Sequence, residues 1–209
     1  KVLFGGLAAR AKWAEHHNKA LQYAAVFVMI GAGAFVGIAI TADSFALVPF
    51  AMAAPLAAYQ FYFDITRRGR RLLPEIAGAA AISAVIASMA LAAGLGTGIA
   101  AALWATYVFR AVPSIMYVRT RLRLEKGRPA SVVEPLAASF TALGSVGLLT
   151  AAGAASYLTL GVFVLLMLRA AIGLSPMRKK VRATRIGIME VVYGILVTAA
   201  IITGYYLQV

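Results

Sequence analysis

The chain has 209 residues, of which 62% are hydrophobic and only 13% are charged, and its mean hydropathy is +0.86. A soluble domain of this length needs a larger charged surface, so the composition excludes one and favours an integral membrane protein. The formal net charge of +13 does not indicate a nucleic-acid partner, because the basic residues lie between apolar runs, and the lack of cysteine excludes disulfides, thiolate metal sites and cysteine nucleophiles.

Apolar runs of about 20 residues, each long enough to cross the hydrocarbon core as a helix, follow one another along the chain. The runs are continuous rather than alternating, which disfavours a membrane β-barrel. We therefore predict an all-α polytopic membrane helix bundle, a single domain over residues 1–209 that begins with a basic segment at 1–20. The seven predicted spans cover residues 21–41, 45–63, 74–93, 97–118, 133–152, 155–173 and 186–207.

The basic residues lie on one side of this seven-span arrangement. Of the 20 lysines and arginines, 18 fall before the first span or in the connections after the second, fourth and sixth spans. The opposite connections, near 42–44, 94–97 and 152–155, carry no positive charge. By the positive-inside rule, we predict a protein of the bacterial cytoplasmic (inner) membrane with the N-terminus of this chain in the cytoplasm and its C-terminus outside.

The stretch "FDITRRGRRLLPE", residues 63–75, connects the second and third spans and contains four arginines and two acids. We interpret the arginines as topology anchors that also meet anionic lipid head groups. Glu75 lies in the first turn of a helix, where a negative charge is favourable. Asp64 lies at a helix C-terminus, where it requires a cation, and we predict Arg67 or Arg68 as its partner.

Ionisable residues within a span are costly and usually have a partner or a function. Arg110 lies about 13 Å inside the fourth span at 1.5 Å per residue, and Glu190 lies inside the seventh. We predict an ion pair between them, either as structural glue or as the wall of a polar pocket that opens to the cytoplasm. Arg169 and Glu134, which are closer to span ends, are interpreted as side chains that reach toward the lipid head groups.

The sequence offers no anchor for a familiar cofactor. His16 and His17, the only histidines, are adjacent and point about 100° apart on a helix, so they cannot jointly hold a haem between membrane helices. The seventh span has no lysine for a retinal Schiff base, and no serine has a histidine partner for a hydrolytic triad. We predict no cofactor, with a lipid or a quinone as a possible ligand.

Three segments together resemble, in order and spacing, the YwiC-like family of bacterial integral membrane proteins: "FDITRRGRRLLPEIAGAAAIS", "SIMYVRTRLR" and "RKKVRATRIGIMEVVYGILV". That family opens with a "KEHGAW"-type segment and further apolar spans, which this chain lacks. The resemblance therefore implies two more helices before Lys1 and nine in a full-length protein. The resemblance implies no particular activity, because the family has no well-established one.

Family members are similar in general plan to intramembrane prenyltransferases, which hold magnesium and a diphosphate on aspartate-rich loops. Asp64 and Glu75 are eleven residues apart and form no paired cluster of that kind, so no metal site is predicted.

Two functions from different classes follow. The first is a non-catalytic subunit or a lipid- or quinone-binding accessory protein, with membrane lipids and other membrane subunits as partners. The second is an intramembrane lipid enzyme that acts on a phosphorylated isoprenoid. A small-molecule transporter comes third, since no internal repeat is evident. The candidate residues for a polar pocket or for head-group contacts are Asp64, Arg67, Arg68, Glu75, Arg110, Arg119, Arg123 and Glu190.

Overall fold

The computed structural model describes residues 29, 31–33, 35–37, 39–40, 44–66 and 68–207. Within these residues it is all-α, without a strand, which confirms the predicted fold class. A 3-10 helix, η1, is followed by six α-helices. Their bounds are η1 Ser44–Leu47, α2 Val48–Ile65, α3 Leu72–Ala92, α4 Thr97–Glu125, α5 Val133–Ala151, α6 Tyr157–Leu174 and α7 Ala183–Leu207.

The chain divides into two compact units, Lys1–Leu47 and Val48–Val209. In the first unit, the described positions between 29 and 40 are helical, and most of the predicted span 21–41 lies outside the described residues. The second unit contains α2 to α7 and every contact discussed below. A single domain over 1–209 stays a prediction.

Six helical segments of the described chain are long and apolar enough to cross a membrane: Ser44–Ile65, Leu72–Ala92, Thr97–Glu125, Val133–Ala151, Tyr157–Leu174 and Ala183–Leu207. α4 ends at Glu125 rather than near residue 118, where the apolar run stops. Hydropathy marks where a helix leaves the bilayer, whereas arginine and leucine continue the helix in water. Its 29 residues measure about 43 Å, so α4 exceeds the roughly 30 Å hydrocarbon core.

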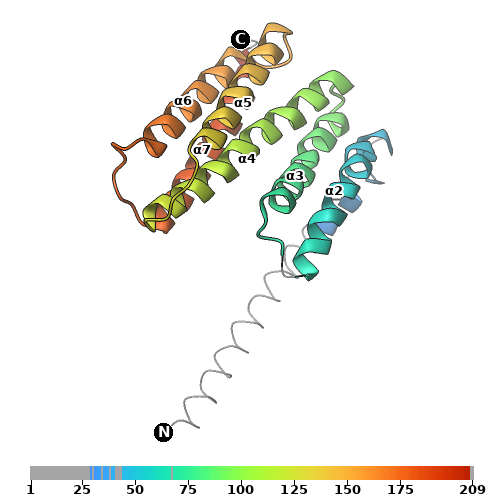
Figure 1. Ribbon diagram of the computed structural model, residues 1–209. Coiled ribbons are helices and arrows are strands. Elements are labelled where there is room, and N and C mark those ends of the chain that lie inside the picture. The colour runs from blue at the N-terminus through green and yellow to red at the C-terminus, as the bar shows by residue number, and fades with distance from the viewer. Residues whose placement is uncertain are drawn as a thin grey trace, which may run out of the picture. The chain divides into compact units, whose positions relative to one another are not determined.

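In the Val48–Val209 unit, consecutive helices pack against each other, and α4 also contacts α6 and α7 (Figure 1). α4 therefore lies between the α2–α3 pair and the group formed by α5, α6 and α7. Small residues let α3 and α4 approach closely, because Ala87, Ala90 and Ala100 form their shared core. Trp104 of α4 adds a hydrogen bond from its indole N–H to the Ala80 carbonyl, 2.9 Å away.

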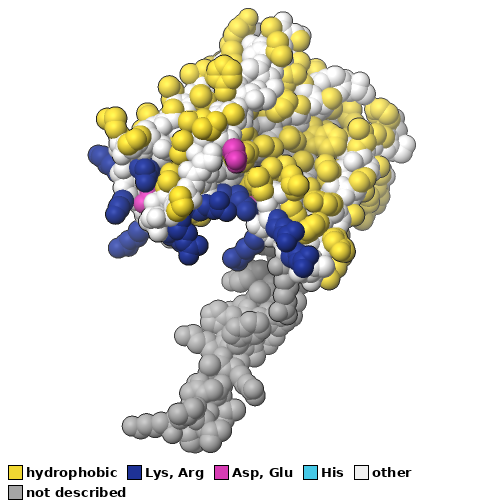
Figure 2. Space-filling model, viewed as in Figure 1, with side chains coloured by type: hydrophobic (Ala, Val, Ile, Leu, Met, Phe, Trp, Pro, Cys, Tyr) yellow, Lys and Arg dark blue, Asp and Glu magenta, His cyan; other side chains and the backbone are white. Residues whose placement is uncertain are grey.

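Basic side chains gather at one end of this unit, whereas its sides expose large hydrophobic residues such as Ile82, Leu148 and Ile195 (Figure 2). That end carries the connections from α2 to α3, α4 to α5 and α6 to α7. The connections at the opposite end, residues 93–96 and 152–156, contain no lysine or arginine. An apolar surface around the helices and a cationic end are what a bilayer requires of a spanning bundle.

Three helices end at a glycine in the left-handed region, with φ of +78° at Gly94, +67° at Gly127 and +72° at Gly153. Each forms a Schellman motif. At Gly153, its amide donates to the Thr150 carbonyl at 3.0 Å and the Ala154 amide donates to the Leu149 carbonyl at 2.8 Å. The motif satisfies carbonyls that the end of α5 would otherwise leave unpaired.

We expect Gly153→Ala to lower the free energy of unfolding by about 1 kcal/mol, since alanine is strained at positive φ. The matched control is Gly144→Ala, within the same helix α5 at ordinary φ and with open space around the added methyl group. That change should raise stability by about 0.5–1 kcal/mol, because alanine is the better helix former. Thermal unfolding in detergent measures both, and equal shifts of the same sign would contradict the assignment.

Candidate functional site

A cluster of polar side chains lies inside the bundle where α4, α6 and α7 meet. Arg110, Ser114 and Tyr117 share one face of α4 because they are four and three residues apart. Arg169 comes from α6 and Glu190 from α7. We call these five residues, together with Tyr193 of α7, the buried polar cluster.

The Glu190 carboxylate has two partners in this cluster. One oxygen forms an ion pair with Arg169, and the other accepts a hydrogen bond from the Ser114 hydroxyl at 2.7 Å. The side chains of Arg169 and Glu190 are only 11% and 17% exposed, so the rest of the protein shields most of the ion pair from water and lipid. The Arg169 guanidinium also lies 4.0 Å from the ring centre of Tyr117 and 4.7 Å from that of Tyr193, which are cation–π distances.

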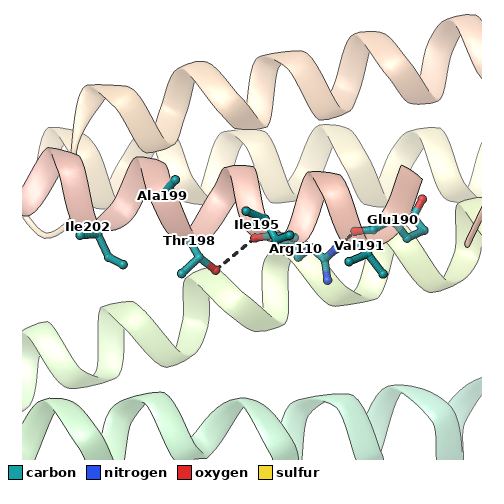
Figure 3. A pocket seen from close by; sticks show the side chains of 8 residues that line it. Arg110, Glu190, Val191, Ile195, Thr198, Ala199 and Ile202 are labelled. Carbon is teal, nitrogen blue, oxygen red and sulfur yellow. Dashed lines mark hydrogen bonds between the residues drawn. The ribbon is translucent and has the colours of Figure 1, made fainter. Parts of the chain in front are cut away.

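Arg110 does not form the predicted ion pair with the Glu190 carboxylate. Its Nη2 instead donates to the backbone carbonyl of Glu190 at 2.7 Å, and its Nε is buried without a partner. Gly194, one turn after Glu190, makes this approach possible, because a Cβ there would lie 3.0 Å from Nη2. Figure 3 shows the Glu190 side chain directed away from Arg110.

The prediction was wrong because sequence gives the depth of a residue along a helix but not the direction in which its side chain points. The Glu190 carboxylate pairs with Arg169 of α6 and with Ser114 of α4, so Arg110 of α4 reaches only the Glu190 carbonyl. Arg169, interpreted from sequence as a residue that reaches toward the head groups, is the true partner. Their similar depth could have indicated this pair from sequence. Arg169 lies five residues before the end of α6, and Glu190 lies seven residues after the start of α7.

We expect Gly173→Ala to destabilise the fold by about 1–3 kcal/mol, the usual cost of overpacking. A Cβ at Gly173 of α6 would lie 2.9 Å and 3.0 Å from two ring carbons of Tyr117, so the ring would be pushed away from Arg169. Gly161→Ala, on the same helix with open space around the new methyl, should cause no loss. Thermal unfolding of both variants tests this, and equal melting temperatures would refute the close contact.

An open groove of about 620 Å³ runs along α7 beside this cluster. Arg110 lies near the Glu190 end of the groove, between Ile195 and Val191, and the wall is mainly apolar (Figure 3). Thr198 adds little polarity, because its hydroxyl bonds to the Tyr107 hydroxyl at 2.8 Å and to the Gly194 carbonyl at 3.1 Å. The lining residues are Arg110, Glu190, Val191, Gly194, Ile195, Thr198, Ala199 and Ile202.

The candidates at the basic end are not brought into one site. Glu75 of α3 pairs with Arg119 of α4 at 2.6 Å, and Arg119 also donates to the Arg70 carbonyl at 2.8 Å. Both side chains are substantially exposed, so the pair contributes little stability. Arg123 is exposed in the last turn of α4.

Asp64 accepts a hydrogen bond from Gln60 of its own helix, 2.9 Å away, and its carboxylate covers the backbone of Gly69. The structure shows no ion pair between Asp64 and Arg68. An arginine partner for Asp64 therefore stays a prediction. Arg67, the other predicted partner, lies outside the described residues.

Arg121, which the sequence analysis counted only among the basic residues between the fourth and fifth spans, is 4% exposed. Its guanidinium donates to the Gly173 carbonyl at the end of α6 and to the Lys179 carbonyl at 2.5 Å. It also lies 2.9 Å from Glu125 Oε1, without the alignment of a hydrogen bond, and Glu125 Oε2 accepts from the Val181 amide at 3.3 Å. Arg121 thus ties the basic α6–α7 connection to the end of α4.

Across the part of the chain that the structure describes, no three histidine, cysteine, aspartate or glutamate side chains lie close enough to hold a metal ion. The chemistry available in the buried polar cluster is therefore hydrogen bonding and charge. The groove beside it adds apolar surface and one guanidinium.

The six apolar helices found among the described residues and a basic end define an integral, multi-pass membrane protein. Residues 4–90 match the family model described as YwiC-like protein. On this stretch the chain is similar to the YwiC-like family, which supports the resemblance drawn from sequence. Of the three segments that carried it, the one from Phe63 to Ser83 lies within the match. No curated protein and no solved structure matches the chain.

Proposed function

We propose that this protein is a non-catalytic accessory subunit of a membrane assembly that binds a lipid or a quinone. The observation that carries the proposal is the groove along α7, because it combines an apolar wall with a single guanidinium at one end. Amphiphiles have the complementary form, an apolar chain with one polar head. A volume of about 620 Å³ lies within the usual range of small-molecule sites.

The pairing of the acids supports a non-catalytic role. Of the five acidic residues in the described part of the chain, three are held by arginines. Catalysis of phosphoryl or prenyl transfer uses carboxylates that are free to hold a metal ion or to move a proton. The three paired acids are Glu75, Glu125 and Glu190.

Lipids that co-purify in mild detergent test the proposal. Native mass spectrometry should detect an amphiphile bound to the wild type, and Ala199→Trp, which fills the groove, should lose it. Leu196→Trp is the matched control, since Leu196 is exposed on the same helix and does not line the groove. Equal retention by both variants would refute binding in the groove. Magnesium-dependent binding of a prenyl diphosphate, lost in Asp64→Asn, would replace the proposal with the lipid enzyme.

The proposed setting is the bacterial cytoplasmic membrane, with the basic end in the cytoplasm and the end of α7 outside. The chain contains no cysteine, so single cysteines can be introduced without altering others. We expect Arg123→Cys to react with a membrane-impermeant maleimide only after the membrane is opened. Ala155→Cys, between α5 and α6, should react in intact cells. Labelling of both from the same side would overturn this topology.

A further inference from the structure

The buried polar cluster carries an uncompensated positive charge. It contains two guanidinia, Arg110 and Arg169, and one carboxylate, Glu190, which Arg169 and Ser114 already engage. Arg110 has only the neutral carbonyl of Glu190 as an acceptor within the described residues. A cation without a counter-ion inside a membrane is costly, so an anion at Arg110 would be strongly favoured.

Arg110 is placed to receive such an anion from the groove. It is the one basic residue among those that line the groove, and the N–H groups of its Nη1 have no acceptor among the described side chains and carbonyls. The Nη2 bond to the Glu190 carbonyl holds the guanidinium in position. A planar guanidinium with open N–H groups matches the two oxygens of a carboxylate.

The remainder of the groove fits one apolar chain. Its lining follows one face of α7 from Glu190 to Ile202, a rise of about 18 Å at 1.5 Å per residue. Gly194 and Ala199 leave space along this face, and Val191 and Ile195 supply apolar contacts. A single extended chain along this face would bury the apolar wall, with its head at Arg110.

The depth of Arg110 in the membrane limits which head groups of an amphiphile can reach it. It lies about 13 Å along α4 from Arg119 at the basic end, inside a hydrocarbon core of about 30 Å. The phosphate of a bilayer lipid stays at the interface and does not reach this depth. A carboxylic acid can enter as the neutral acid, since burial disfavours the charged form, and bind the guanidinium as the carboxylate once its proton has passed to the aqueous phase. A quinone can accept a hydrogen bond there but leaves the charge uncompensated.

We infer that the groove along α7 binds a single-chain amphiphile with a carboxylate head, of the long-chain fatty acid class, and that Arg110 holds the head. This inference rests on the proposed binding function and specifies its ligand. The tail would extend along α7 toward Ile202.

Titration of the full, delipidated chain in nanodiscs with palmitic acid labelled with ¹³C at the carboxyl carbon tests the inference. The methyl ester of the same acid and a quinone with an alkyl tail are the neutral comparisons. We expect the wild type to bind the acid at least about tenfold more tightly than the ester, the equivalent of about 1.4 kcal/mol. Arg110→Gln should remove this preference and keep ester binding. Arg110→Lys should retain part of it, and Arg128→Gln, in the exposed connection after α4, should retain all of it.

Each outcome decides a different point. Equal affinity of the wild type for acid and ester, or for acid and quinone, would refute the carboxylate head and leave amphiphile binding intact. The binding function itself would be refuted if none of the three probes bound and if Ala199→Trp co-purified with the same amphiphiles as the wild type. Thermal unfolding reports whether Arg110→Gln folds. If it does not, the affinities of the wild type for acid and ester still test the inference.

Discussion

Glu190→Gln is expected to lower the free energy of unfolding by about 3 kcal/mol, the lower end of the cost of breaking a buried ion pair. Glutamine keeps the size of the side chain and a hydrogen-bond acceptor for Ser114, but it removes the charge that compensates Arg169. The Arg169 guanidinium would remain between the Tyr117 and Tyr193 rings without a counter-ion. Equilibrium unfolding in mixed micelles measures the loss.

The double variant Arg169→Met/Glu190→Met separates charge from packing. Removing both charges leaves neither uncompensated, so the double variant should be more stable than Glu190→Gln alone. Glu134→Gln, which removes an exposed carboxylate at the start of α5, is the control and should change stability by less than about 0.5 kcal/mol. A loss in Glu190→Gln no larger than in this control would show that the pair contributes nothing.

The second large effect is expected at Arg121. Arg121→Met leaves the carbonyls of Gly173 and Lys179 without their donor and Glu125 without its cation. We expect a loss of about 3 kcal/mol, and local opening of the α6–α7 connection. Trypsin should then cleave that connection, which contains Arg178, Lys179 and Lys180, at least about tenfold faster than in the wild type, because about 1.4 kcal/mol already raises an open population tenfold.

Arg123→Met provides the comparison from the same turn of α4. Arg123 is exposed, so its loss should alter neither stability nor the rate of cleavage. Arg121→Lys is also informative, since one ammonium cannot reproduce the planar guanidinium that serves two carbonyls and a carboxylate. Proteolysis of Arg121→Met at the wild-type rate would contradict the role assigned to this side chain.

The helices could be predicted from sequence because a bilayer imposes length and apolar character on each of them. α5 and α6, for example, begin and end within two residues of the predicted spans. The sequence also predicted that the basic connections lie at one end of the bundle, since every second connection of such a bundle lies at the same end. Neither result depends on how a helix is rotated about its axis.

The candidate site does depend on that rotation. The ion pair predicted between Arg110 and Glu190 is not formed, and Arg110 instead donates to the Glu190 backbone carbonyl. The absence of a side chain at Gly194 leaves room for the Arg110 guanidinium, and a single glycine in an apolar helix does not predict such an approach. Arg121 was missed for a similar reason, because its burial follows from how the α6–α7 connection folds back over α4.

The order of the charged residues along the chain has a consequence for biosynthesis. Arg110 and Arg169 precede Glu190, so both guanidinia are inserted before the carboxylate that neutralises one of them is translated. Until α7 enters the bilayer, the nascent protein carries two intramembrane cations, and the only acidic residues of α4, α5 and α6 are Glu125 at the end of α4 and Glu134 at the start of α5. A chain halted before α7 thus carries one more uncompensated intramembrane charge than the completed bundle, in which Glu190 neutralises Arg169.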